Sequence, residues 1–149
     1  MSTTLPYDTS LEDSILGSVI KDPKTHNEII PYITSTEVFY QTKAQLLWKK
    51  LSTMIRNNEH IDMVTVSSSI TKEEAAKGIS PYYISLCIQD VGSTGSIALY
   101  ASKLYEKYLL RKVIVLTQEI QMKARESSPQ VYDVISDTHA LLGELLTVR

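Results

Sequence analysis

The stretch Ser96–Arg125, SIALYASKLYEKYLLRKVIVLTQEIQMKAR, decides the fold because it contains no glycine and no proline. Most of its residues favour or tolerate a helix, so it predicts one unbroken helix about 45 Å long. A domain of this mass is usually narrower than that. We therefore expect the helix to project from the domain or to be packed along its length by another element.

The next segment supplies a partner for this helix. Ser127-Ser128-Pro129 ends the first helix and starts another, because proline is favoured in the first turn of a helix. The apolar residues that follow at helical spacing are Val131, Val134, Ile135, Thr138, Leu141, Leu142, Leu145 and Leu146. So short a connection requires antiparallel packing, and residues 94–149 are predicted to form a helical hairpin.

Apolar residues of the long helix recur at spacings of four, three and four, which places them on one face. This stripe consists of Leu109, Val113, Leu116 and Ile120, and Leu110 and Ile114 lie beside it. The second helix is shorter than the first, so one hairpin is not expected to bury both apolar faces. The N-terminal part of the chain or a second copy must cover the remainder. We predict that Leu109, Val113, Leu116 and Ile120 form an oligomer interface.

Composition restricts the function classes. Hydrophobic residues make up 43% of the 149 residues, which indicates a folded core, and the formal net charge is −2. Neither residues 1–93 nor residues 94–149 form a basic module, so little direct binding to DNA is expected. The single cysteine, Cys87, lies in an apolar run and is expected to be a buried small hydrophobe. No leader or membrane-spanning run is visible, which predicts a cytoplasmic protein.

Residues 1–93 are predicted to form a compact helical head. Met1–Asp8 is expected to be a loose arm, and Asp90–Gly95 a flexible linker to the hairpin. Helix starts are predicted at Thr9 or Ser10, at Asp22-Pro23, at Thr34–Glu37 and at Asp62, with helices over residues 41–56 and 82–89. Residues 63–70 fit a helix or a strand on local pattern alone. Gly17, inside the first helix, either permits close approach by another helix or is merely tolerated.

The sequence carries no recognisable catalytic chemistry. Its glycines do not fit a nucleotide-binding loop, and its three histidines have no partners at metal-ligand spacing. Adjacent carboxylates are limited to Glu12-Asp13 and Glu73-Glu74, whose side chains point apart on a helix. We therefore expect no catalytic residue, no metal and no cofactor in this chain. The nine tyrosines are interpreted as packing and interface residues rather than as a base-stacking surface.

The order of several short motifs resembles the N-terminal domain of DnaB-type replicative DNA helicases. These motifs are Leu11-Glu12 with Ile15-Leu16-Gly17, Val38-Phe39-Tyr40, Ile61–Val66 (IDMVTV, similar to the family's IDLVTV), Tyr83-Ile84 with Cys87, Ile97 with Tyr100-Ala101, Leu109-Leu110-Arg111, and Asp133–Ser136. The resemblance covers residues 6–147. It departs from the family at residues 92–96, where GSTGS replaces PSAAN, and at Cys87, where the family has leucine.

The resemblance implies an all-α fold with a multi-helix head at residues 1–93 and a projecting hairpin at residues 94–149. It also implies a helix at residues 63–70. In the family, hairpins pair into dimers, and three dimers form a ring-shaped collar above the motor domains. The collar docks a DnaG-type primase and in some cases a helicase loader; the matching positions here are Tyr83, Ile114 and Ile120. The resemblance also implies that ATP and Mg²⁺ bind a motor domain, which we do not expect within these 149 residues.

Two other readings stay open at the level of sequence. The chain could be an unrelated helical adaptor that dimerises through its hairpin, or an enzyme or nucleic-acid binder whose motifs are not recognisable. The resemblance favours a domain that assembles a replicative helicase and docks primase at the replication fork.

Overall fold

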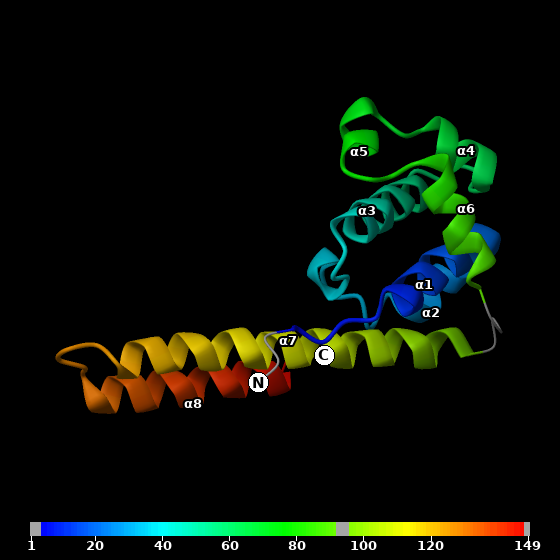
Figure 1. Ribbon diagram of the computed structural model, residues 1–149. Coiled ribbons are helices and arrows are strands. Elements are labelled where there is room, and N and C mark those ends of the chain that lie inside the picture. Colours follow the sequence, from blue (N-terminus) through cyan, green and yellow to red (C-terminus); the bar gives the residue numbers. More distant parts are fainter. Residues whose placement is uncertain (1–3, 92–95, 148–149) are drawn as a thin grey trace.

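The computed structural model describes residues 4–91 and 96–147, and every regular element in them is helical. Figure 1 shows a head of short helices seated on one end of a long two-helix hairpin. The elements in chain order are α1 (Thr9–Lys21), η1 (Pro23–Thr25), α2 (His26–Ile29), η2 (Thr36–Val38), α3 (Thr42–Arg56), α4 (Met63–Ser68), α5 (Lys72–Ala76), α6 (Pro81–Gln89), α7 (Ile97–Ala124) and α8 (Val131–Thr147). The predicted all-α head and antiparallel hairpin are confirmed.

Side-chain caps fix where the head helices begin. Asp8 caps α1 by accepting a hydrogen bond from the Leu11 amide at 3.0 Å, so the predicted caps Thr9 and Ser10 are wrong. Both residues lie inside the first turn, and the aspartate before them reaches the free amide of Leu11. Asp22 ends α1 and caps η1, with Pro23 in its first turn, as predicted.

The segment after α3 resolves the ambiguity between helix and strand. The Asp62 side chain accepts from the Thr65 amide, and the Thr65 hydroxyl accepts in return from the Asp62 amide. This reciprocal capping box starts the helix α4, which outweighs the β-branched composition of the segment.

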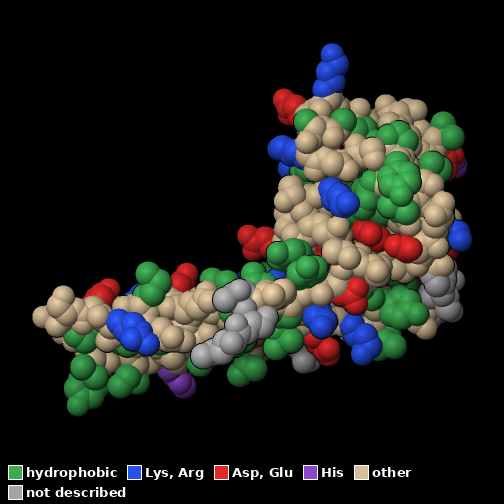
Figure 2. All heavy atoms as spheres, in the orientation of Figure 1, with side chains coloured by type: hydrophobic (Ala, Val, Ile, Leu, Met, Phe, Trp, Pro, Cys, Tyr) green, Lys and Arg blue, Asp and Glu red, His purple; other side chains and the backbone are tan. Residues whose placement is uncertain are grey.

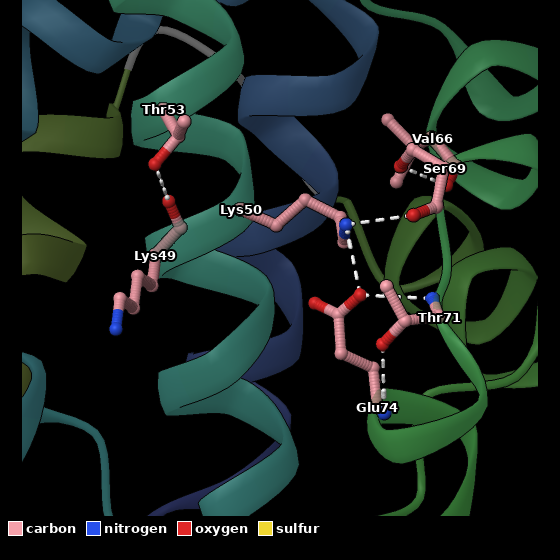
Figure 3. Close-up of polar contacts among 7 residues, drawn as sticks. All are labelled: Lys49, Lys50, Thr53, Val66, Ser69, Thr71 and Glu74. Atoms are coloured by element: carbon pink, nitrogen blue, oxygen red, sulfur yellow. Dashed lines mark hydrogen bonds and ion pairs between the residues drawn. The ribbon is translucent and has the colours of Figure 1, made fainter.

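A second capping box builds a helix that was not predicted. Thr71 and Glu74 cap α5 in a charged stretch, residues 72–77, for which no helix was predicted. Figure 3 shows that Lys50 of α3 holds this helix, donating to Glu74 Oε1 and to the Ser69 carbonyl, both at 2.9 Å. The charges of the short helix therefore cap it and tie it to the head.

The core of the head includes the first half of α7. Side chains with no exposed surface include Ile15, Leu16 and Val19 (α1), Leu47 and Leu51 (α3), Ile84 (α6) and Leu104 (α7). The long helix is therefore shared between the head and the hairpin, while α8 packs on its second half. The predicted linker falls mostly on residues outside the described ranges, and the division of the chain at residue 93 stays a prediction.

Cys87 is buried, as predicted, and burial raises the pKa of its thiol to about 12. At neutral pH the thiol is therefore protonated and a poor nucleophile. Among the described residues, no helix is both long enough and apolar enough to cross a membrane.

Gly17 allows α1 and α6 to touch. A β-carbon at this position would lie 1.9 Å from the Cys87 carbonyl oxygen and 2.4 Å from its carbonyl carbon. Both atoms belong to backbone, which cannot rotate away as a side chain could. The glycine is therefore required for close helix packing, which settles the two alternatives left open by the sequence.

We predict that Gly17→Ala destabilises the fold by about 3 kcal/mol or more, because α1 and α6 must separate. Gly143→Ala is the matched control: it also lies inside a helix, but its β-carbon would meet nothing within 4 Å. There alanine should stabilise by up to about 1 kcal/mol through its higher helix propensity. Urea unfolding of the two variants measures both effects; equal midpoints would contradict the packing role of Gly17.

Candidate interaction site

A buried carboxylate joins the first helix to the start of the third. Glu12 has no exposed surface, and its carboxylate accepts from the Tyr40 amide at 2.7 Å, the Gln41 amide at 3.1 Å and Gln41 Nε2 at 3.1 Å. Burial raises the pKa of the Glu12 carboxyl, and these hydrogen bonds together with the nearby Arg111 oppose the rise. Three donors around one carboxylate match its ionised form.

Arg111 of α7 completes this cluster from the other side. Its guanidinium is buried and donates to three carbonyl oxygens: that of Pro6 at 3.0 Å, Glu37 at 3.2 Å and Val38 at 2.9 Å. Burial lowers the pKa of Arg111, and the charge of Glu12 opposes this. The planar guanidinium of arginine holds its N–H donors in a fixed arrangement, so it can bind several fixed acceptors at once. One side chain thus joins α7, the N-terminal arm and the η2 segment.

The N-terminal arm is held in place where the structure describes it, so the predicted loose arm is wrong for residues 4–8. The Pro6 carbonyl is bound by Arg111, and the Tyr7 ring stacks on Tyr40 with centroids 4.3 Å apart. Asp8 caps α1 directly afterwards. The contacts of Pro6 and Tyr7 could not be predicted from local sequence, because their partners Arg111 and Tyr40 lie more than thirty residues away.

The hairpin itself covers part of the predicted oligomer stripe. Leu109, Leu116 and Ile120 are half-buried within one chain, while Val113 is 37% exposed. Leu109 packs against the core of the head. Leu116 lines a cavity together with Leu141 of α8. The stripe therefore serves partly as contact between α7 and α8.

A second apolar surface lies beside this contact, and we call it the outer face. On α8, the half-buried residues Val134, Thr138, Leu141 and Leu145 repeat at spacings of four, three and four. The residue directly after a contact position is turned about 100° away from the partner helix. In an antiparallel pair, the residues that follow each contact stripe fall on the same side of the hairpin.

The outer face is apolar on both helices. On α7 its apolar members are Leu110 and Ile114, with the neighbouring stripe residue Val113 at its border. On α8 they are Ile135, Leu142 and Leu146, with Val131 one turn before Ile135, and the exposed His139 lies among them. Leu110 is 52% exposed and Ile135 is 59% exposed. Figure 2 shows hydrophobic side chains along the edge of the hairpin that lies away from the head. The α8 residues were seen in the sequence as part of the helical repeat, but the repeat could not tell which of them face α7.

The predicted docking residues are not brought together. Tyr83 lies in the head with 3% of its surface exposed, and its hydroxyl donates to Asp13 Oδ1 at 2.9 Å. Lys43 Nζ lies 4.4 Å from the centre of the Tyr83 ring. Burial raises the pKa of the Tyr83 hydroxyl. Ile114 and Ile120 are half-buried on the hairpin. In this conformation Tyr83 is a core residue, so any part it has in docking is indirect.

No group of three or more histidine, cysteine, aspartate or glutamate side chains suited to a metal ion occurs within residues 4–91 and 96–147. The polar side chains described above bind backbone and one another. What this arrangement offers is a rigid connection between head and hairpin, and an exposed apolar surface for association.

Comparison with known proteins places these features in a family. The family model described as DnaB-like helicase N terminal domain matches residues 4–106. A replicative DNA helicase DnaB from Buchnera aphidicola is 26% identical over 117 residues, which are 78% of this chain. The chain spans only 25% of the length of that curated relative.

Two solved structures share the fold. The N-terminal domain of DnaB helicase from Mycobacterium tuberculosis superposes with a TM-score of 0.83 at 20% identity, covering 95% of this chain and 99% of that one. A DnaB-like replicative helicase, described with its interactions with primase, gives a TM-score of 0.72 at 18% identity. This match covers 93% of this chain and 31% of that one.

We predict that Arg111→Met destabilises the chain by about 3–5 kcal/mol, since it leaves the Glu12 charge and three carbonyl oxygens without their buried partner. Glu12→Gln combined with Arg111→Met should cost less than the sum of the two single changes, because the charges compensate each other. Arg56→Met, at the exposed end of α3, is the control and should stay within about 0.5 kcal/mol of wild type. Additive losses in denaturant unfolding would contradict the coupling.

Proposed function

Since the chain belongs to the family of DnaB-like helicase N-terminal domains, we propose that it acts within a replicative DNA helicase, in assembly and docking rather than in catalysis. On this proposal ATP hydrolysis and unwinding belong to a motor domain, and the chain works at the replication fork in the cytoplasm. Residues 1–93 would serve as the head and residues 94–149 as the hairpin. The fold and the family match support this placement.

The observation that carries the assembly role is the outer face. Side chains such as Leu110, Ile135 and Leu142 are 40–59% exposed in one chain, and they lie together on a rigid hairpin. Burying a large apolar side chain is worth roughly 1.5–3 kcal/mol, so a second hairpin laid on this face would gain several such contributions. A self-complementary face of this kind suits a two-fold dimer. Three such dimers would build the proposed collar.

Docking of primase is the second part of the proposal. A solved relative with the same fold is described with its interactions with primase. The motif resemblance implies Ile114 and Ile120 as the docking positions of this chain. Both are half-buried on α7, so each keeps surface that a partner can cover. Tyr83 would contribute by supporting Lys43 above its ring. A helicase loader is a further candidate for the same collar.

We predict that Val113→Asp converts the assembled chain to monomer while the head stays folded, because a carboxylate would be buried without a partner in the dimer. Val115→Asp is the matched control: it is 45% exposed on the same helix, but two residues further along it is turned about 200° away. Sedimentation at micromolar concentration, with circular dichroism as a check of folding, measures both. A wild type that is monomeric, or two variants that sediment alike, would contradict the proposed interface.

We also predict that Ile114→Asp weakens binding of a DnaG-type primase C-terminal domain about tenfold or more, because the change places a charge in an apolar contact. Isothermal titration measures the dissociation constant, and sedimentation of the same variant shows whether assembly is intact. Val115→Asp again serves as the control and should bind like wild type. If the Ile114→Asp variant still assembles and binds primase with unchanged affinity, Ile114 is not part of the docking site.

A further inference from the structure

A buried histidine of the head belongs to none of the surfaces described above. His26 is 6% exposed, and its ring stacks on the indole of Trp48 with centroids 4.8 Å apart. Trp48 in turn packs against Phe39, at a centroid distance of 5.7 Å. His26 Nε2 lies 3.1 Å from the Ser52 hydroxyl oxygen. The imidazole is therefore positioned by α3, which carries both Trp48 and Ser52.

The second ring nitrogen of His26 is buried, and no group among the described residues forms a hydrogen bond with it. A neutral imidazole carries one N–H donor and one bare acceptor nitrogen, so its single donor can bind Ser52. Protonation places a hydrogen on both nitrogens. The Nδ1–H would then be a buried donor without an acceptor, on a ring that also carries a charge. The site is therefore suited to the neutral imidazole.

The electrostatic surroundings of His26 do not compensate a charge on its ring. Burial lowers the pKa of His26. The ionisable side chains on the segment itself and on the helices packed against it are Lys24, Glu28, Lys49, Lys50, Arg56, Tyr100, Lys103 and Tyr105. Within the described chain, none of these groups shifts the pKa of His26. Stacking on Trp48 attracts a cation, but removal of the ring from water acts against the charged form and outweighs it.

The segment that carries His26 depends on tertiary contacts for its position. The helix α2 is one turn of four residues, and no side chain of the described chain caps its start. A helix of this length is not stable by itself in water. Its anchors are the buried side chains of Thr25, His26, Ile29 and Ile33, and α2 packs on α7 beneath the head (Figure 1).

We propose that His26 is a pH-sensitive switch in the head: the neutral imidazole holds residues 23–33 against α3, and the imidazolium releases them. Because α2 packs on α7, release loosens the contact between the head and the start of the hairpin. The unfolded chain takes up a proton near the ordinary histidine pKa of 6.5, and the folded chain only at lower pH. The free energy of unfolding therefore falls as the pH drops below 6.5. This inference does not depend on the assembly or the docking proposed above.

Urea unfolding at pH 7.5 and pH 5.5, at one protein concentration, tests the switch. Between these values the folding equilibrium constant of the wild type should fall by up to about tenfold, as expected for one histidine that resists protonation when folded. His26→Gln does not titrate there and should lose less than about twofold. The chain has three histidines, so His60→Gln with His139→Gln leaves His26 alone. This double variant changes two exposed residues and should lose as much as the wild type.

The fluorescence of Trp48, the only tryptophan of the chain, reports on the ring that stacks on it. Without denaturant it should change between pH 7.5 and pH 4.5, with a midpoint below 6.5. His26→Phe keeps an aromatic ring beside Trp48 but cannot be protonated, so this change should be absent. Amide exchange, corrected for the effect of pH on the intrinsic rates, should speed up in residues 23–33 before it does so in residues 81–89 of α6.

The proposal is overturned if His26→Gln and His26→Phe lose as much stability in acid as the wild type, or if the double variant loses none. Where His26→Gln does not fold, His26→Phe alone decides this comparison. A fluorescence midpoint at or above pH 6.5 would show that Trp48 favours the imidazolium, and no change down to pH 4.5 would show that His26 does not titrate. Either result overturns the switch, as does equal loss of amide protection in residues 23–33 and 81–89.

Discussion

The buried cluster built around Glu12 and Arg111 is the constraint on which the rest of the structure depends. It is assembled from segments that are distant in sequence: α1, the η2 segment, the N-terminal arm and the middle of α7. Three of the short motifs that resemble the helicase family meet here, namely Leu11-Glu12, Val38-Phe39-Tyr40 and Leu109-Leu110-Arg111. Their resemblance to the family thus has a physical reason, because each supplies one part of a single buried polar cluster.

A cluster of this kind contributes more to orientation than to stability. Removing both charges from water is costly, and an apolar replacement of the same shape would often be as stable. Apolar packing alone does not fix the angle between α7 and the head. Three carbonyl acceptors around the planar Arg111 guanidinium do fix it, because they allow a single placement of α7. The hairpin is therefore presented by the head in one orientation. Its outer face points away from the head. The cavity that Leu116 and Leu141 line lies between the head and the hairpin.

Much of the fold follows from local sequence. The long helix and the Asp62 cap were predicted because their signals lie within a few residues: an unbroken run of helix formers, and a capping side chain before a helical repeat. The helix α5 and the Asp8 cap were missed because a charged stretch and a loose arm fit the same residues equally well. The role of Arg111 could not be predicted, since its partners are 73 to 105 residues away in the chain. The motif Leu109-Leu110-Arg111 is part of the resemblance to the family, but the resemblance does not show what Arg111 binds.

The interface prediction shows where periodicity stops being informative. On a helix that packs against one partner, a stripe at spacings of four, three and four identifies a buried face, but it does not say which partner buries it. Leu116 and Ile120 are half-buried in the hairpin itself, whereas three of the four residues that follow the contact positions on α8, namely Ile135, Leu142 and Leu146, are apolar and exposed. A helix that met only α7 would need one stripe. The second stripe, continued on α7 by Leu110 and Ile114, leaves an exposed apolar surface, and this is the surface that the proposed second hairpin would cover.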